Sequence, residues 1–228
     1  MSETSLGSGK NEQGKMQEKE QPHTYRLSFT FGGLLVPESR IAARQYLKSG
    51  SWEAARAEIE ERKLLQKTRR STAYRYFREI RDRLQTADPN EIEMIAKGDE
   101  DTVRLVLLVI VCRYYRLIRD LVMELAAWKF HGRDTLLERY EIDAFFEKKG
   151  EQHPELLGVS PSTKRKLVQV AIRILREARL IDAAAGKTII QKPAVPDSIL
   201  RYYAGNRNYE AFDLFLLTRS EIQKAIGE

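Results

Sequence analysis

The stretch Leu105-Val106-Leu107-Leu108-Val109-Ile110-Val111-Cys112 is the longest apolar run in the chain, and an arginine closes it on either side. Acidic residues precede it at 99–101, and carboxylates stabilise the positive end of a helix dipole. A helix that is apolar on every side belongs in the interior of a bundle. We therefore predict one long central helix from Thr102 to about Phe130, ended by Gly132.

The residues before this run predict a group of shorter helices. Pro37 suits the first position of a helix, and Gly50 suits its end. Ser51 and Ser71 are the expected caps of the next two helices, because a serine side chain accepts a hydrogen bond from the free amides of a first turn. A short helix is expected at 90–97. Ahead of them, residues 25–31 alternate apolar and polar side chains, which indicates an extended segment that pairs with a remote strand or lies across helices.

After Gly132 the pattern changes to helix, helix and hairpin. Helices are predicted at Leu136–Lys149 and Pro161–Arg179, and Ser160 is the expected cap of the second. Short strands at 180–184 and 188–191, on either side of a turn at 185–187, predict a β-hairpin. This order is typical of a winged-helix unit. Two short helices, at 197–203 and 209–217, are expected to complete the fold.

These elements predict a mainly α protein with two helical subdomains. We expect a disordered tail at 1–22 and a helix-turn-helix-like N-terminal domain at 23–132, which includes the long central helix. A winged-helix-like C-terminal domain with a short β-hairpin is expected at 133–228. The N-terminal unit is a loose relative of the helix-turn-helix motif, because its connection at 63–70 exceeds the usual turn of about 3–4 residues.

The composition argues against several kinds of site. The chain has one cysteine, which cannot form an internal disulfide, and three histidines without the spacing of zinc ligands. Gly186-Lys187-Thr188 resembles the end of a P-loop, but Ile181 stands where that motif needs glycine. We expect no catalysis, no cofactor and no metal. No apolar signal is found near the N-terminus, and no run reaches the length of about 20 residues that spans a bilayer, so we expect a cytoplasmic protein without membrane contact.

Charge is unevenly distributed along the 228 residues, whose formal net charge is +6. Residues 66–85 hold seven basic and two acidic residues, and residues 160–181 hold six basic and one acidic, so each segment has a net charge of +5. Residues 88–101 and 134–155 are acidic, at −5 and −4. Each basic segment coincides with the third helix of a helical triad, which is the helix that enters the major groove in helix-turn-helix and winged-helix proteins.

The spacing of basic residues predicts where a nucleic acid is bound. On the second segment they form one stripe opposite the apolar face, and arginine suits phosphate and guanine because its planar fork makes paired hydrogen bonds. The alternative is a solvated face without a ligand. The predicted nucleic-acid-binding residues are Arg69, Arg70, Arg75, Arg78, Arg81, Lys164, Arg165, Lys166, Gln169, Arg173, Arg176 and Lys187.

Several segments resemble the BrxA family. The run Tyr25-Arg26-Leu27-Ser28-Phe29-Thr30-Phe31-Gly32-Gly33-Leu34-Leu35-Val36-Pro37-Glu38-Ser39 is similar to its N-terminal signature. Further similarities are Leu64-Leu65-Gln66 with Arg69 and Ser71-Thr72, Cys112-Arg113-Tyr114-Tyr115-Arg116 with Ile118-Arg119, Asp143-Ala144-Phe145-Phe146, His153-Pro154-Glu155-Leu156 and Leu175-Arg176-Glu177-Ala178. The resemblance covers about residues 24–192. It implies a small cytoplasmic component of BREX (bacteriophage exclusion) defence systems, an all-helical fold compared with NusB, and DNA binding without assigned catalysis.

Three functions follow from the residues and the resemblance together. The first is a non-catalytic accessory protein of a BREX system that binds duplex DNA, mainly through phosphate contacts from the two basic helices. The second is an RNA-binding module, which the NusB comparison suggests. The third is a scaffold whose acidic faces dock other proteins, including other BREX components.

Overall fold

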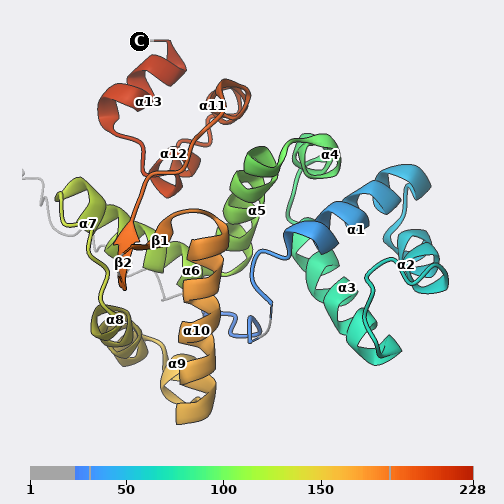
Figure 1. The fold of residues 1–228 in the computed structure, drawn as a ribbon, viewed down its shortest axis with the longest axis horizontal. Helices are drawn as coiled ribbons and strands as arrows, with labels where there is room; N and C mark the ends of the chain where they lie inside the picture. The colour runs from blue at the N-terminus through green and yellow to red at the C-terminus, as the bar shows by residue number, and fades with distance from the viewer. Residues whose placement is uncertain (1–23, 31, 185, 228) are drawn as a thin grey trace, which may run out of the picture.

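The computed structural model describes residues 24–30, 32–184 and 186–227 (Figure 1). The described chain is mainly helical with a small antiparallel hairpin, which confirms the predicted fold class. The tail predicted at 1–22 lies outside the described residues. Within the described ranges, no helix is both long enough and apolar enough to cross a membrane.

Helix α5 (Glu100–Tyr114) is the centre of the fold, as its sequence predicts. Every residue of the apolar run 105–112 is buried. The side chain of Asp99 caps the helix by accepting a hydrogen bond from the amide of Thr102 at 2.8 Å. Helices α1, α3, α4 and α12 pack around α5. Because neighbouring helices cover α5 on all sides, an unbroken apolar sequence suits it.

The prediction of a single long helix as far as Phe130 is wrong. The chain leaves helical geometry at Tyr115, with φ −119° and ψ 88°. It then continues as α6 (Arg116–Asp120), a π-helical segment η1 (Leu121–Ala127) and α7 (Trp128–His131), which ends at Gly132 as expected. The break has a tertiary cause: the buried Tyr115 side chain donates its hydroxyl hydrogen bond to Glu79 of another helix, and Phe29 packs edge-on against its ring.

The N-terminal helices are α1 (Val36–Ser49), α2 (Trp52–Glu61), α3 (Arg70–Leu84) and α4 (Pro89–Lys97). Ser51 caps α2 by accepting from the amide of Ala54 at 3.1 Å, as predicted. The predicted cap of α3 is wrong, because that helix begins at Arg70 and makes no side-chain cap hydrogen bond. Ser71 therefore lies inside the first turn of α3 and not at its cap.

The segment at 25–30 forms no strand among the described residues and contacts helices instead, so the second of the two predicted placements is correct. Tyr25 stacks on His153 with ring centroids 3.8 Å apart, and its hydroxyl donates to Asp120 at 2.5 Å. Burial and this bond to a carboxylate raise the pKa of Tyr25. The segment thus connects the region of α6 with the beginning of α9 (Pro154–Leu157).

The hairpin unit contains α8 (Arg139–Gln152), α10 (Pro161–Glu177), β1 (Ile181–Ala184) and β2 (Lys187–Ile190). The strands pair antiparallel, with Ile181 opposite Ile190. The predicted helix start at Leu136 is wrong, because residues 135–137 are extended beside β2. The amide of Leu137 donates to Thr188 at 2.9 Å, and the amide of Ile190 donates to Thr135 at 2.7 Å.

The chain ends in α11 (Asp197–Gly205), α12 (Glu210–Leu214) and α13 (Arg219–Ile226). Helix α13 was not predicted, although Thr218 and Glu221 form its capping box. Helices α11 and α12 return to the N-terminal half. Arg119 of α6 makes a double hydrogen bond to Glu210 at 2.9 and 2.7 Å, and Tyr203 donates to Glu91 of α4 at 3.1 Å.

Candidate nucleic-acid interface

Helix α10 presents the basic stripe that its sequence predicts. Lys166, Gln169, Arg173 and Arg176 are exposed, while Leu167, Val170, Ala171 and Ile174 on the opposite side are buried. Arg165, Lys166, Arg173 and Arg176 make no ion pair with any described residue, whereas Lys164 reaches Glu147 at 3.3 Å. Pro161 occupies the first turn, and Ser160 caps the helix by accepting from the amide of Thr163 at 3.2 Å. The cationic groups of the stripe are thus available to a ligand.

Helix α3 presents less charge than its sequence suggests. Arg69, Arg70, Arg75 and Arg78 are exposed, but Arg70 is bound to Glu60 at 2.9 Å. Arg81 is half-buried and forms two hydrogen bonds with Asp82, at 3.0 and 2.6 Å.

Arg83 contributes to the charge of the segment but not to the surface. Its side chain is 2% exposed, and Nε donates to Glu79 at 2.7 Å. A buried pair of this kind is part of the core, so the net charge of +5 overstates the exposed charge of α3.

One peptide group joins the two basic helices. The carbonyl oxygen of Gly33 accepts from Nη1 of Arg83 on α3 at 2.7 Å, and the amide of Leu34 donates to Glu177 on α10 at 2.6 Å. The carbonyl and the amide belong to the same peptide bond. A Cβ at Gly33 would lie 2.3 Å from a Glu177 carboxylate oxygen, so a larger residue there would push this carboxylate away from the Leu34 amide.

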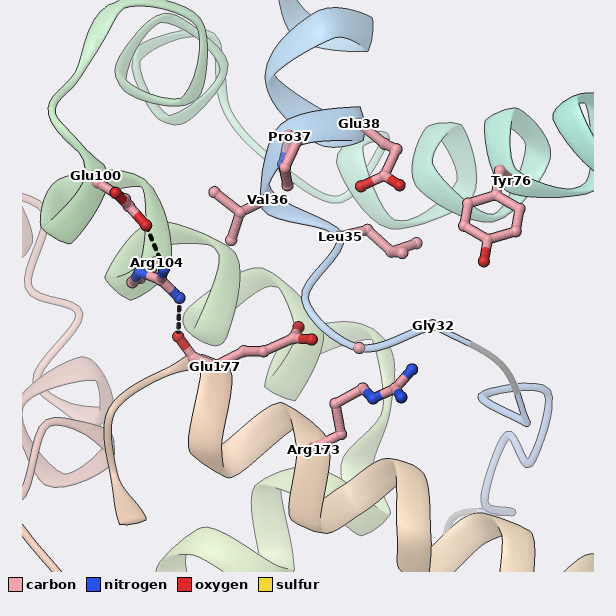
Figure 2. A pocket seen from close by; sticks show the side chains of 11 residues that line it. Gly32, Leu35, Val36, Pro37, Glu38, Tyr76, Glu100, Arg104, Arg173 and Glu177 are labelled. Carbon is pink, nitrogen blue, oxygen red and sulfur yellow. Dashed lines mark hydrogen bonds and ion pairs between the residues drawn. The ribbon is translucent and has the colours of Figure 1, made fainter. Parts of the chain in front are cut away.

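A hollow of about 360 Å³ is lined by residues of the segment 32–38 and by side chains of α3, α5 and α10. Figure 2 shows Tyr76 of α3 on one side of the hollow and Arg173 of α10 on the other, with the chain around Gly32 and Leu35 between them. Arg104 of α5 also lines the hollow. Its guanidinium group donates to the carbonyl oxygen of Glu177 at 2.6 Å and to the carboxylate of Glu100. The two basic helices therefore border the same hollow.

The remaining predicted contact is Lys187, which is exposed at the start of β2. Gly186 beside it has a φ of +77°, a conformation that glycine adopts easily in a tight turn. Gly186-Lys187-Thr188 accordingly lies in a hairpin, not in the strand-to-helix loop of a nucleotide site.

The acidic segments are largely occupied by internal contacts. Glu91 is 1% exposed and accepts two hydrogen bonds from Arg113, at 2.8 and 2.9 Å. Asp101 pairs with Arg179 at 2.6 Å. In the second segment, Glu141 shares the buried amine of Lys129 with a neighbouring aspartate. Glu91 therefore adds nothing to the acidic surface, whereas Glu93, Glu138 and Glu147 remain exposed.

The chemically reactive side chains of the described residues have structural surroundings. Among them, no three or more His, Cys, Asp and Glu side chains are grouped as metal ligands would be. Cys112 is buried in α5, and desolvation raises the pKa of its thiol. His153 is buried in its stack with Tyr25. These contacts give structural roles to the cysteine and to this histidine.

The contact that holds the two helices together was not predicted. Gly33 and Glu177 both lie in segments that resemble the BrxA family, and Glu177 was counted as the one acidic residue of a basic segment, but nothing in the sequence pattern placed them beside each other. A Gly-Gly pair in general indicates that another group approaches the backbone closely. Here that group is Glu177, which lies about 140 residues later in the chain, and local sequence patterns do not identify a partner at that distance.

Comparisons with known proteins give consistent results. Residues 23–206 match the family model for BrxA. A protein of Bacillus cereus named "BREX protein BrxA" is 28% identical over 53% of this chain and 60% of its own length, so this match spans less than two thirds of that relative. A protein of the same name from Escherichia coli is 25% identical over 73% of this chain and 78% of its own.

A crystal structure of an uncharacterised protein from Magnetospirillum magneticum has a similar fold. It superposes with a TM-score of 0.73, covering 85% of this chain and 98% of that chain at 22% identity. At that identity the likeness supports the fold alone. The family match, by contrast, spans most of the sequence and includes both basic helices. The chain therefore belongs to the BrxA family of BREX systems.

Proposed function

We propose that the protein is a non-catalytic, duplex-DNA-binding accessory component of a BREX phage-defence system. The exposed stripe of α10 is the observation that carries the proposal. Arg165, Arg173 and Arg176 project from one helix without a carboxylate partner among the described residues. Uncompensated arginines on a helix face attract phosphate, and they contact it through paired hydrogen bonds.

The surroundings of α10 support a winged-helix mode of binding. The extended residues 135–137, helix α8, the short helix α9, helix α10 and the two strands follow one another, and residues 135–137 join β2 through backbone hydrogen bonds. In winged-helix proteins the helix that precedes the hairpin enters the major groove. Helix α3 would add contacts through Arg69 and Arg78, and Lys187 would add one from the hairpin.

The names of the relatives support the assignment to phage defence. Those of Bacillus and Escherichia are named BREX proteins, and the proposal transfers that setting to this chain. A scaffold that docks partners through acidic faces is less well supported than DNA binding, because several carboxylates of those faces, such as Glu91 and Glu141, are already bound to basic side chains of this chain. RNA binding shares the same basic surface and is one of the outcomes of the test.

Electrophoretic mobility shifts across a salt series test the proposal. We expect a 30-base-pair duplex DNA to be bound at low salt, with an affinity that falls steeply as salt rises, at a slope of about −0.9 per neutralised phosphate. Single-stranded DNA and duplex RNA of the same length are the comparisons. Tighter binding of duplex RNA would replace the proposal by the RNA-binding function, and no shift with any of them at low salt would refute it.

A further inference from the structure

The hollow beside α7 has features that DNA binding does not use. It has a volume of about 670 Å³ and lies between η1, α7 and α12. Met123 and Ala127 form part of its apolar lining, and Trp128 and Asp213 stand beside them. In Figure 1, α7 lies at the left of the molecule and α3 at the right, so a ligand in this hollow would lie far from α3.

Trp128 is the most unusual residue of the hollow. Its side chain is 72% exposed, although large aromatic side chains contribute most to stability when they are buried. The π-helical turn η1 leads directly into Trp128, and such turns are often found at functional sites. An exposed tryptophan at the edge of an apolar hollow is typical of the residues that anchor protein interfaces.

The charge of the hollow selects the chemistry of its occupant. Asp213 is half-buried and makes no ion pair with any residue that the structure describes. Burial raises the pKa of Asp213, and the carboxylate of Glu210 acts in the same direction, against the opposing effect of His131. A cation placed beside Asp213 would stabilise its ionised form.

Two other basic groups line the hollow, His131 and Lys129. His131 opposes the rise in the pKa of Asp213 but makes no ion pair with it among the described residues. The amine of Lys129 is 4% exposed and bound to Asp134 and Glu141, at 2.6 and 2.5 Å. Asp134 shares this amine with Glu141 and is itself 57% exposed. The hollow is therefore locally acidic on a protein whose net charge is +6.

We propose that this hollow docks a segment of another protein, and that the segment inserts an arginine between Trp128 and the carboxylate of Asp213. A guanidinium group stacks on an indole ring and also makes two parallel hydrogen bonds to a carboxylate, which an ammonium group cannot do. Apolar residues beside the arginine would cover Met123 and Ala127. The acidic lining disfavours nucleic acid at this place, because phosphate and carboxylate repel each other.

Peptide titration tests this docking directly. The probe is a capped tripeptide with arginine between two leucines, and its control carries citrulline, which has nearly the same shape but no charge. The chain has two tryptophans, Trp52 and Trp128, so the tryptophan fluorescence of a Trp52→Phe variant reports on Trp128 alone. Calorimetric titration of the unmodified chain gives the same answer if that variant does not fold.

We expect the arginine peptide to bind at least tenfold more tightly than the citrulline peptide. Trp128→Ala and Asp213→Asn should each weaken binding of the arginine peptide at least tenfold. Tyr140→Ala is the matched control, because Tyr140 is 70% exposed but does not line the hollow. Equal binding of the two peptides, unchanged binding by Trp128→Ala, or no binding at millimolar peptide would overturn the proposal.

Two further measurements separate this proposal from other occupants. Light scattering should give the same mass for the unmodified chain and for Trp128→Ala, and a smaller mass for the variant would make a second copy of the chain the occupant. Duplex-DNA affinity of Trp128→Ala should also be unchanged, and a loss would assign the hollow to nucleic acid. Failure of the DNA-binding proposal alone would leave the peptide result unaffected.

Discussion

Helices α3 and α10 belong to segments of equal net charge but present that charge differently. In the segment around α3, Lys67, Arg70, Arg81 and Arg83 are all engaged with carboxylates. In the segment around α10, only Lys164 and Arg179 make ion pairs with described residues. Part of the difference lies on the buried sides of the helices: the buried residues of α10 are all apolar, whereas α3 buries the ion pair of Arg83 and Glu79. The other three pairs of the α3 segment lie nearer the surface, where neighbouring carboxylates are within reach. Net charge along a sequence therefore overstates the charge available to a ligand wherever such pairs form.

The largest expected effect concerns Arg83, which separates a structural arginine from a DNA-binding one. Arg83→Met should lower the free energy of unfolding by about 3–5 kcal/mol, because it leaves the carboxylate of Glu79 buried without its positively charged partner, with only the hydroxyl of Tyr115 still bound to it. Arg78→Met, on the exposed side of the same helix, should change it by less than about 0.5 kcal/mol. Urea unfolding followed by circular dichroism measures both variants. Equal stability of the two would show that Arg83 and Glu79 are solvated.

The second prediction compares the two helices as DNA contacts. Arg173→Glu with Arg176→Glu should weaken duplex binding by roughly 3 kcal/mol, or on the order of 100-fold, since hydrogen bonds to charged groups contribute about 1.5 kcal/mol or more each. Arg69→Glu with Arg78→Glu on α3 should weaken it less. Salt slopes should fall by about one for each phosphate contact removed. A greater loss from the α3 pair would reverse the proposed order, and thermal melts of both variants control for folding.

Features that depend on residues close together in the chain were predicted correctly, and features that depend on distant residues were not. The buried run at 105–112, the cap at Ser160 and the hairpin were predicted correctly, because each depends on residues close together in the chain. The long helix and the helix start at Leu136 were predicted wrongly. Tyr115 leaves the helix while its hydroxyl is bound to α3, and residues 135–137 pair with β2 about 50 residues later.

The candidate site divides in the same way. The α10 stripe could be predicted because its spacing reports which side of one helix is exposed. The internal role of Arg83 and the joining role of Glu177 could not, because their partners Glu79, Gly33 and Leu34 are brought to them only by the fold. Which charges remain at a surface is decided by tertiary contacts.

The third prediction concerns the joint between the helices. Glu177→Ala leaves the buried amide of Leu34 without its acceptor, which should cost about 1–3 kcal/mol of stability. Loosening the spacing of α3 and α10 should also weaken duplex binding, since two linked contacts bind tightly only when their geometry matches the ligand. Glu177→Gln removes the same charge but keeps an acceptor oxygen for the Leu34 amide. The glutamine variant should therefore bind duplex DNA more tightly than the alanine variant. Equal binding of the two variants would show that a fixed spacing is not required.

The smallest expected effect compares the beginnings of the two helices. Ser160→Ala removes the acceptor for the amide of Thr163 and should destabilise the protein by about 1 kcal/mol. Ser71→Ala removes no cap, because α3 begins before it, and alanine is the better helix former, so stability should stay equal or rise by a few tenths of a kcal/mol. Thermal unfolding of the two variants measures the difference. A loss at Ser71 equal to that at Ser160 would restore Ser71 as the cap of α3 and place the start of that helix two residues later, at Thr72.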